Sequence, residues 1–142
     1  MAYADDTDLG MRLTQQKLQD LSDLQNSGAI DTDVTTAALN SASATIDSYC
    51  GGRYQVPLQP SDQVVDICVD LAVFKLYVGR QRPIPETVKA AHDLALQFLK
   101  DVATGKATLD QAGVVQTSEM NTVTRDHHSQ PEVFDNRKLK AF

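Results

Sequence analysis

The sequence predicts a mainly α-helical fold, a small antiparallel bundle of four to five helices followed by a long extended C-terminal arm. Apolar residues recur at helical spacing through residues 1–105, and most of these segments follow a residue that commonly caps helices. From Lys106 the helical period fades, and two short strand-like pieces remain near residues 121–124 and 132–134. We therefore expect a helical bundle body at 1–105 and an extended arm at 106–142. A chain of 142 residues is typical of one domain.

Two short helices are expected first. Thr7 is a suitable N-cap for one of them and Thr14 for the other. The inner side of the second helix would carry Leu18, Leu21 and Leu24. Ser27-Gly28 then interrupts the chain, which separates these short helices from the longer ones that follow.

Asp31 is a suitable N-cap for the first long helix, which Gly51-Gly52 would end. Its single apolar stripe consists of Val34, Ala38, Ala42, Ile46 and Tyr49. Residues 53–60 are expected to be extended, because Pro57 and Pro60 restrict the residues that precede them.

Ser61 is expected to cap the next helix, at about residues 62–79. Apolar residues cover nearly every side of this segment, which places it in the centre of the bundle or between subunits. The last helix would begin at Pro85 and end at Gly105. Its stripe consists of Val88, Ala91, Ala95, Phe98 and Val102. Short connections make successive helices antiparallel neighbours.

The charge of the chain is concentrated in the expected body. The net charge is −6, and residues 1–105 hold 14 acids and 8 bases, whereas residues 106–142 hold 5 of each. An acidic body argues against a protein whose main task is to bind phosphates. No apolar run is long enough for a membrane span and no signal peptide is evident, so we expect a soluble protein without membrane contact.

No catalytic constellation is evident in the sequence, so we expect neither an enzyme nor a cofactor. Cys50 and Cys68 are interpreted as two buried free thiols. His127-His128 would point to opposite faces of a strand and bind one metal ion poorly. Asp66 and Asp70 lie one helical turn apart, as an acid–base pair could. A structural or intersubunit ion pair is the preferred interpretation, with Arg53 as the candidate partner of Asp70.

An ordered set of short segments carries a family resemblance across most of the chain. The two most telling segments are Gly52-Arg53-Tyr54-Gln55-Val56-Pro57-Leu58 and the terminal Leu139-Lys140-Ala141-Phe142. Between them lie Cys68-Val69-Asp70-Leu71-Ala72 and the run from Phe98 to Leu109. The set resembles the small head–tail joining proteins, connectors or adaptors, of Mu-like tailed bacteriophages. Residues 111–131 match nothing in that pattern, and the family favours glycine at the position of Ala141.

The resemblance implies a structural virion protein with a defined place in the phage neck. Such proteins form a homo-oligomeric ring, typically of about twelve copies, between the portal protein and the next neck or tail-completion protein. DNA passes through the channel of the ring without specific binding. The expected location is the neck of the virion, and the host cytoplasm during assembly. The alternatives are a soluble phage assembly factor and a tail-completion or stopper protein.

The end of the arm is the expected partner-binding segment. Its apolar residues would anchor it on the portal or on a neighbouring copy, and its bases would meet an acidic surface. The anchoring residues are Val133, Phe134, Leu139 and Phe142, and the basic residues are Arg137, Lys138 and Lys140. Candidate subunit contacts in the body are Arg53, Tyr54 and Asp70.

Overall fold

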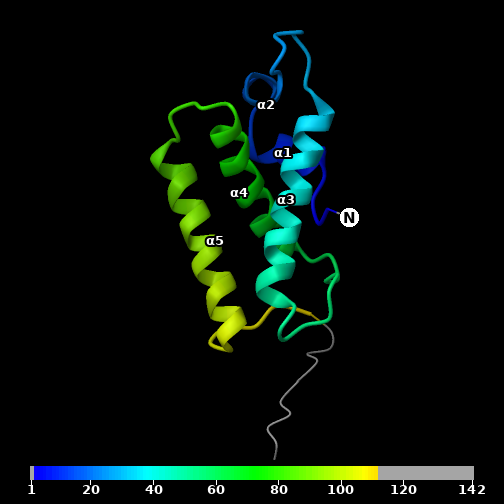
Figure 1. The fold of residues 1–142 in the computed structure, drawn as a ribbon, viewed down its shortest axis with the longest axis vertical. Helices are drawn as coiled ribbons and strands as arrows, with labels where there is room; N and C mark the ends of the chain where they lie inside the picture. Colours follow the sequence, from blue (N-terminus) through cyan, green and yellow to red (C-terminus); the bar gives the residue numbers. More distant parts are fainter. Residues whose placement is uncertain (1, 112–142) are drawn as a thin grey trace, which may run out of the picture.

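The computed structural model describes residues 2–111 as a bundle of five helices (Figure 1). The helices are α1 (Asp6–Arg12), α2 (Gln15–Ser22), α3 (Thr32–Cys50), α4 (Asp62–Gly79) and α5 (Glu86–Thr104). The predicted mainly α-helical bundle is therefore confirmed. The two strand-like pieces expected near residues 121–124 and 132–134 lie outside the described residues.

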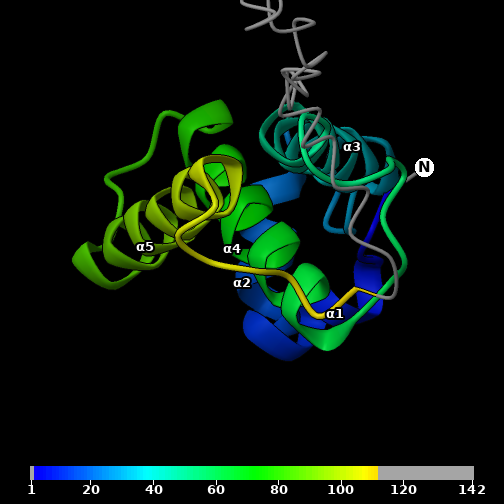
Figure 2. The same ribbon diagram turned by 90° about the horizontal axis from the view of Figure 1, so that it is seen from below.

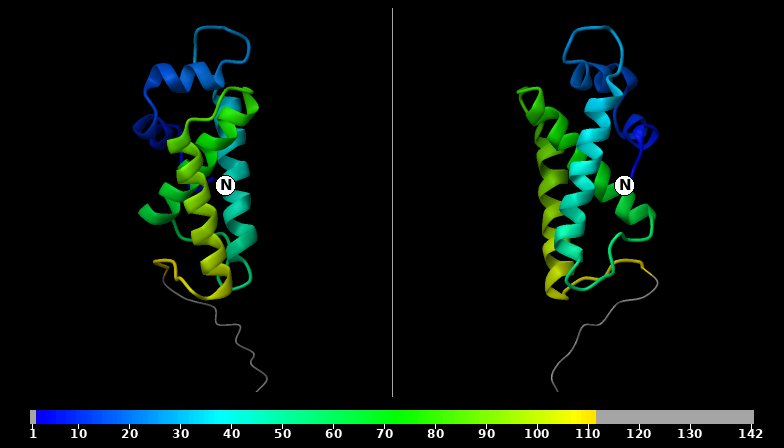
Figure 3. Two further views of the ribbon diagram at one scale, coloured as in Figure 1. Left: turned by 90° about the vertical axis from the view of Figure 1, so that its left-hand side faces the viewer. Right: turned by 45° about the vertical axis from the view of Figure 1, so that its right-hand side comes forward.

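The three long helices run antiparallel along the long axis of the molecule (Figure 1). Seen along this axis, α4 lies between α3 and α5, and α1 and α2 cover its remaining side (Figure 2). The short helix α2 lies across the bundle near the start of α3 (Figure 3). We call this end, where α3 begins and α4 ends, the upper end, and the opposite end the lower end.

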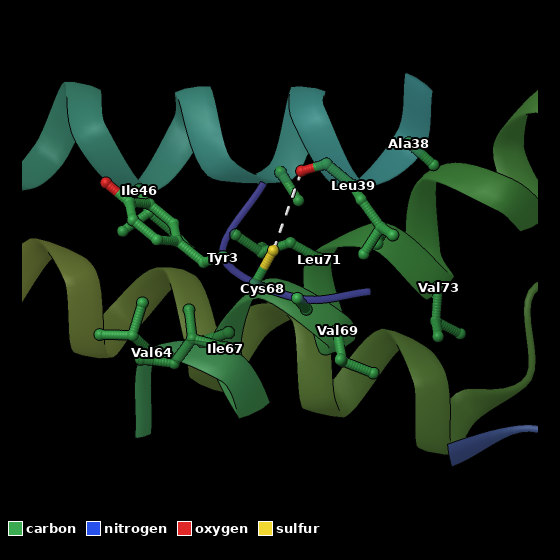
Figure 4. Packing of buried hydrophobic residues seen from close by; sticks show 14 of the residues in the cluster. Tyr3, Ala38, Leu39, Ile46, Val64, Ile67, Cys68, Val69, Leu71 and Val73 are labelled. Atoms are coloured by element: carbon green, nitrogen blue, oxygen red, sulfur yellow. Dashed lines mark hydrogen bonds between the residues drawn. The ribbon is translucent and has the colours of Figure 1, made fainter. Parts of the chain in front are cut away.

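The central position of α4 follows from its sequence, because a helix that is apolar on nearly every side must be covered on nearly every side. Its buried residues contact all four other helices. Cys68 is fully buried and its thiol points to the carbonyl oxygen of Leu39 on α3, 3.8 Å away (Figure 4). Cys50 is also buried, and both cysteines are free, as expected. No helix in the described part of the chain is long and apolar enough to cross a membrane.

Most helix boundaries agree with the expected caps. Thr14, Asp31 and Ser61 each accept a backbone N–H bond at the start of α2, α3 and α4. The expected cap of α1 was wrong. Asp5 caps this helix instead of Thr7, because its carboxylate accepts from the N–H groups of Thr7 and Asp8 while Asp8 accepts from the N–H of Asp5.

Two further boundaries differ in detail. Pro85 is the N-cap of α5 rather than its first helical residue. The helix α2 ends at Ser22, so Leu24 lies beyond it and is 52% exposed instead of facing inward. The carboxylate of Asp23 accounts for this early end, because it accepts the N–H groups of Ser27 and Gly28 at 2.8 and 2.7 Å and forms a compact loop.

The packed part of the chain continues past the expected body boundary at residue 105. Gly105 ends α5 in the left-handed conformation, with φ of 84°. The next residues turn back under the lower end, where the side chain of Leu109 is buried. The side-chain amide of Gln111 makes two hydrogen bonds of 2.8 Å with the backbone of Gln59.

Candidate partner-binding surfaces

A groove of about 400 Å³ lies between the α1–α2 junction, α4 and the start of α5. Its walls are mostly apolar, and they come from two pairs of helices, α1 with α2 and α4 with α5, that are far apart in the sequence. The apolar lining includes Leu13, Val73, Tyr77, Val88 and Ala91. Asp70, in the polar part of the lining, was expected to need a partner, but the groove could not be predicted from the sequence, since the α1–α2 junction closes one of its sides.

An ion-pair cluster forms one edge of this groove. The guanidinium of Arg12 lies 3.3 Å from the carboxylates of both Asp66 and Asp70. The expected pairing of Asp70 with Arg53 is therefore wrong, because α1 crosses α4 and brings Arg12 to the acidic pair. Burial raises the pKa of Asp70 and the nearby Asp66 raises it further, while Arg12 opposes this shift.

Tyr77, one of the residues that line the groove, has a hydroxyl group without a hydrogen-bond partner among the described residues. Tyr77 is 4% exposed, and its hydroxyl oxygen is buried and unpaired within residues 2–111. A buried polar group of this kind is unfavourable unless something donates to it or accepts from it. Lys17 lines the same groove and has no ion-pair partner in the described part of the chain. The groove therefore combines apolar walls with unused polar groups, as binding sites do.

Arg53 and Tyr54 make their contacts inside the chain, at the lower end. One guanidinium nitrogen of Arg53 donates to the carbonyl oxygens of Val102, at 2.8 Å, and Ala107, at 3.4 Å. The hydroxyl of Tyr54, which is 3% exposed, accepts the N–H of Leu109 at 3.0 Å. These two residues therefore hold the end of α5 and the following turn against the loop after α3.

Gly105 suits this arrangement because of its positive φ, which a residue without a side chain adopts most readily. The guanidinium of Arg53 lies close by, since a Cβ atom at residue 105 would be 3.4 Å from one of its nitrogens.

Tyr3 is a buried junction that no motif or helical period marks in the sequence. Its hydroxyl donates to Asp47 and accepts the N–H of Leu58 at 2.8 Å, and its own N–H donates to Ser43 at 3.0 Å. Burial, together with the hydrogen bond to Asp47, raises the pKa of Tyr3 to about 12. Tyr3 therefore joins the N-terminus, α3 and the loop before α4.

Two further side chains of types that can act in catalysis, Cys50 and His92, are accounted for by packing. Burial raises the pKa of the Cys50 thiol to about 11, which is the opposite of an activated nucleophile. His92 stacks on Phe74, with ring centroids 3.7 Å apart. Within residues 2–111 no group of three or more potential metal ligands is found, and His127-His128 lies outside this range.

The residues expected to anchor the arm also lie outside the described part of the chain. They are Val133, Phe134, Arg137, Lys138, Leu139, Lys140 and Phe142. Of the body residues expected at subunit contacts, Tyr54 is buried within the chain, while Asp70 lies in the wall of the groove. The structure thus separates an internal pair, Arg53 and Tyr54, from a surface site that includes Asp70.

Comparison with known proteins identifies relatives of the whole body. The family described as Gp36 of bacteriophage Mu matches residues 3–127. The Mu-like prophage FluMu protein gp36 of Haemophilus influenzae is 30% identical over 118 residues, which are 82% of each chain. The family match spans the five helices, the groove and the hydrogen-bonded lower end. The chain therefore belongs to the bacteriophage Mu Gp36 family.

Proposed function

We propose that this protein is the head–tail connector of a Mu-like phage. In this role about twelve copies form a ring between the portal protein and the next neck or tail-completion protein, around the path of the DNA. The protein acts by binding and requires no catalysis. The observation that carries the proposal is membership of a phage protein family together with the connector-like order of segments, which includes Gly52–Leu58 and the terminal Leu139–Phe142.

The division of the chain supports this role. The structure describes the packed bundle as far as Gln111, and residues 112–142 follow it in the sequence. At about 3.3 Å per residue these could reach on the order of 100 Å when extended, far enough to contact a neighbouring copy or a portal. The final six residues carry three bases and no acid. We assign the contact with the acidic surface of the portal or a neighbour to this end of the chain.

In a ring, weak contacts between neighbouring copies are sufficient for a stable assembly. Each copy repeats the same contact, so the effective concentration of neighbours on a template increases the total stability of the collar. Head-to-tail contacts close into a ring only when the rotation between copies is correct. The portal supplies that template in the proposed assembly.

The acidic body suits a channel through which DNA passes without binding. All of the net charge of −6 lies in residues 1–105, and like charge repels the phosphate backbone. Neutralising exposed acids of the body should therefore alter the retention or ejection of DNA. Unchanged retention and ejection across a full set of such variants would contradict this part of the proposal.

Deletion of residues 132–142 tests the role of the terminal segment. The truncated protein should keep a folded body, since the described core ends at Gln111, but should fail to join capsids to tails. Circular dichroism reports the fold, and electron microscopy of lysates reports joined particles. A variant with residues 132–142 in scrambled order is the matched control for length and charge. Normal particle assembly by the truncated protein would overturn this role.

Copy number and position in the particle separate the connector from its alternatives. Quantitative mass spectrometry of purified virions should find about twelve copies per particle. Absence from virions would favour an assembly factor that leaves before maturation. Imaging of the neck should place the ring directly below the portal, whereas a position one ring lower would identify a stopper or tail-completion protein.

A further inference from the structure

We propose that two opposite flanks of the bundle form the subunit interface of the ring, so that the groove and α5 of one copy receive the outer face of α3 of the next. This inference rests on the proposed ring. In the proposed ring, a second copy of this chain therefore occupies the groove. Four features of the described residues support the pairing: the position of the flanks, the surface of α5, the surface of α3 and the distribution of charge.

The two flanks lie on opposite sides of the molecule. Seen along the bundle axis, the side between α5 and the α1–α2 pair faces away from α3 (Figure 2), and the groove lies on that side. Contacts between two different patches are heterologous, and they close into a ring when the rotation permits. An arrangement of copies side by side therefore brings the groove of one copy to α3 of its neighbour.

The helix α5 has a second apolar stripe beyond the one that enters the core. Its core stripe contains Ala95, Leu99 and Val102, all of which are buried. The second stripe, at spacings of four, three and four residues, consists of Thr87, Ala91, Leu94 and Phe98. Thr87 and Ala91 line the groove and Leu94 is 71% exposed, whereas Phe98 packs partly against the core. The part of this stripe from Thr87 to Leu94, and Leu94 above all, therefore leaves apolar surface that a partner can cover.

The outer face of α3 is unusually poor in charge for a surface helix. Its central exposed stripe consists of Ala37, Asn40, Ala44 and Ser48. These small side chains permit close approach of another helix, and covering them removes no charge from water.

The charges at the upper end are complementary between the two flanks. Residues 18–52 contain five acids and no base, and residues 71–85 contain three bases and no acid. The loop before α3 and the loop between α4 and α5 both lie at the upper end, on opposite flanks (Figure 1). Copies placed side by side would therefore bring Arg80 and Arg82 of one towards Asp31 and Asp33 of the next, which favours this pairing over like-with-like contacts.

Cross-linking in assembled particles tests the interface directly. A chain with both Leu94→Cys and Ala44→Cys should give, after treatment of particles with a short bismaleimide, a ladder of dimers, trimers and larger products on denaturing gels. Each single variant should give no ladder, because a head-to-tail contact needs one cysteine from each flank. The native Cys50 and Cys68 are buried and contribute little background. The matched control carries Leu94→Cys and Gln55→Cys, with Gln55 exposed in the loop after α3.

The outcomes separate this inference from the proposed function. Particles that contain the doubly substituted protein but give no ladder would overturn the interface and leave the connector role intact. Dimers from Leu94→Cys alone would indicate a contact of α5 with itself and would also overturn it. If the unmodified protein is missing from purified particles, the connector role fails, and the same cross-linking of the concentrated full-length protein then decides the interface.

A charge exchange provides an independent test. Leu94→Asp should leave thermal unfolding unchanged, because Leu94 is exposed, and should lower incorporation into particles at least tenfold. Adding Ala44→Lys to the same chain should restore much of that incorporation, since every copy in a ring presents both flanks. Normal incorporation of the folded Leu94→Asp protein, or failure of Ala44→Lys to restore any, would contradict the proposal.

Discussion

The two ends of the bundle are held together in different ways. At the lower end, side chains of Arg53, Tyr54 and Gln111 bond to backbone groups that are 49 to 55 residues away in the sequence. At the upper end, the carboxylate of Asp23 bonds to Ser27 and Gly28, only four or five residues away. The lower end is thus stabilised by tertiary contacts, and this upper loop by a local turn.

Because of this difference, we expect the two ends to have different roles. Long-range hydrogen bonds close large loops of the chain and fix the position of Gln111, from which the remaining residues continue. The upper end instead carries Arg80 and Arg82, which have no ion-pair partner within residues 2–111. Side chains at the lower end are consequently expected to determine stability, and those at the upper end to determine association.

The largest effect on stability is expected for Arg53→Met. This change keeps the apolar stem but removes the donor to the carbonyl oxygens of Val102 and Ala107, so the free energy of unfolding should fall by about 2–3 kcal/mol. Urea denaturation measures this change. Arg82→Met at the upper end is the control and should alter stability by less than about 0.5 kcal/mol. Equal losses of unfolding free energy for Arg53→Met and Arg82→Met would contradict the expected difference in stability between the two ends.

A smaller effect is expected for Tyr3→Phe. Loss of the hydroxyl leaves the buried N–H of Leu58 unpaired and removes a hydrogen bond to Asp47, so the free energy of unfolding should fall by about 1–2 kcal/mol. Thermal unfolding at neutral pH is a suitable measurement. Tyr49→Phe, in α3 and half-buried, is the matched control. A loss no greater than that of the control would show that Tyr3 contributes packing alone.

The smallest effect is expected at the upper end, from Asp23→Asn. The N–H of Ser27 and further hydrogen bonds lower the pKa of Asp23 in the folded state. Its contribution to stability is therefore present above the ordinary pKa of 3.8 and is lost as the pH falls through the lower folded value. The Asn variant should show a shallower loss of stability than the unmodified protein between about pH 5 and about pH 2. Parallel pH profiles would mean that the Asp23 turn does not stabilise the folded state electrostatically.

Much of the fold could be predicted from local sequence signals. The caps Thr14, Asp31 and Ser61, the stop at Gly105 and the central position of α4 depend on neighbouring residues and on helical period, and all agree with the structure. The partner of Asp70 could not be predicted in the same way. That choice depends on the direction in which α1 crosses α4, which no local pattern encodes.

The candidate site was harder to predict for the same reason. The expectation that Asp70 takes part in an ion pair was correct, but the expected partner was Arg53, whereas α1 brings Arg12 to the acidic pair. The groove forms only when four helices pack together. In the sequence Tyr77 therefore looks like any other aromatic residue of the core, although its hydroxyl is unpaired among the described residues. Tyr3 could not be found from helical periodicity, because it precedes the first helix.

The two hydrogen bonds between Gln111 and Gln59 have a consequence for polarity. They fix the position of Gln111, the last described residue, at the lower end of the molecule. In the proposed ring of copies standing side by side, residue 112 of every copy would follow on the same face. Such a ring would have two chemically different sides, so it would join a head to a tail in only one orientation.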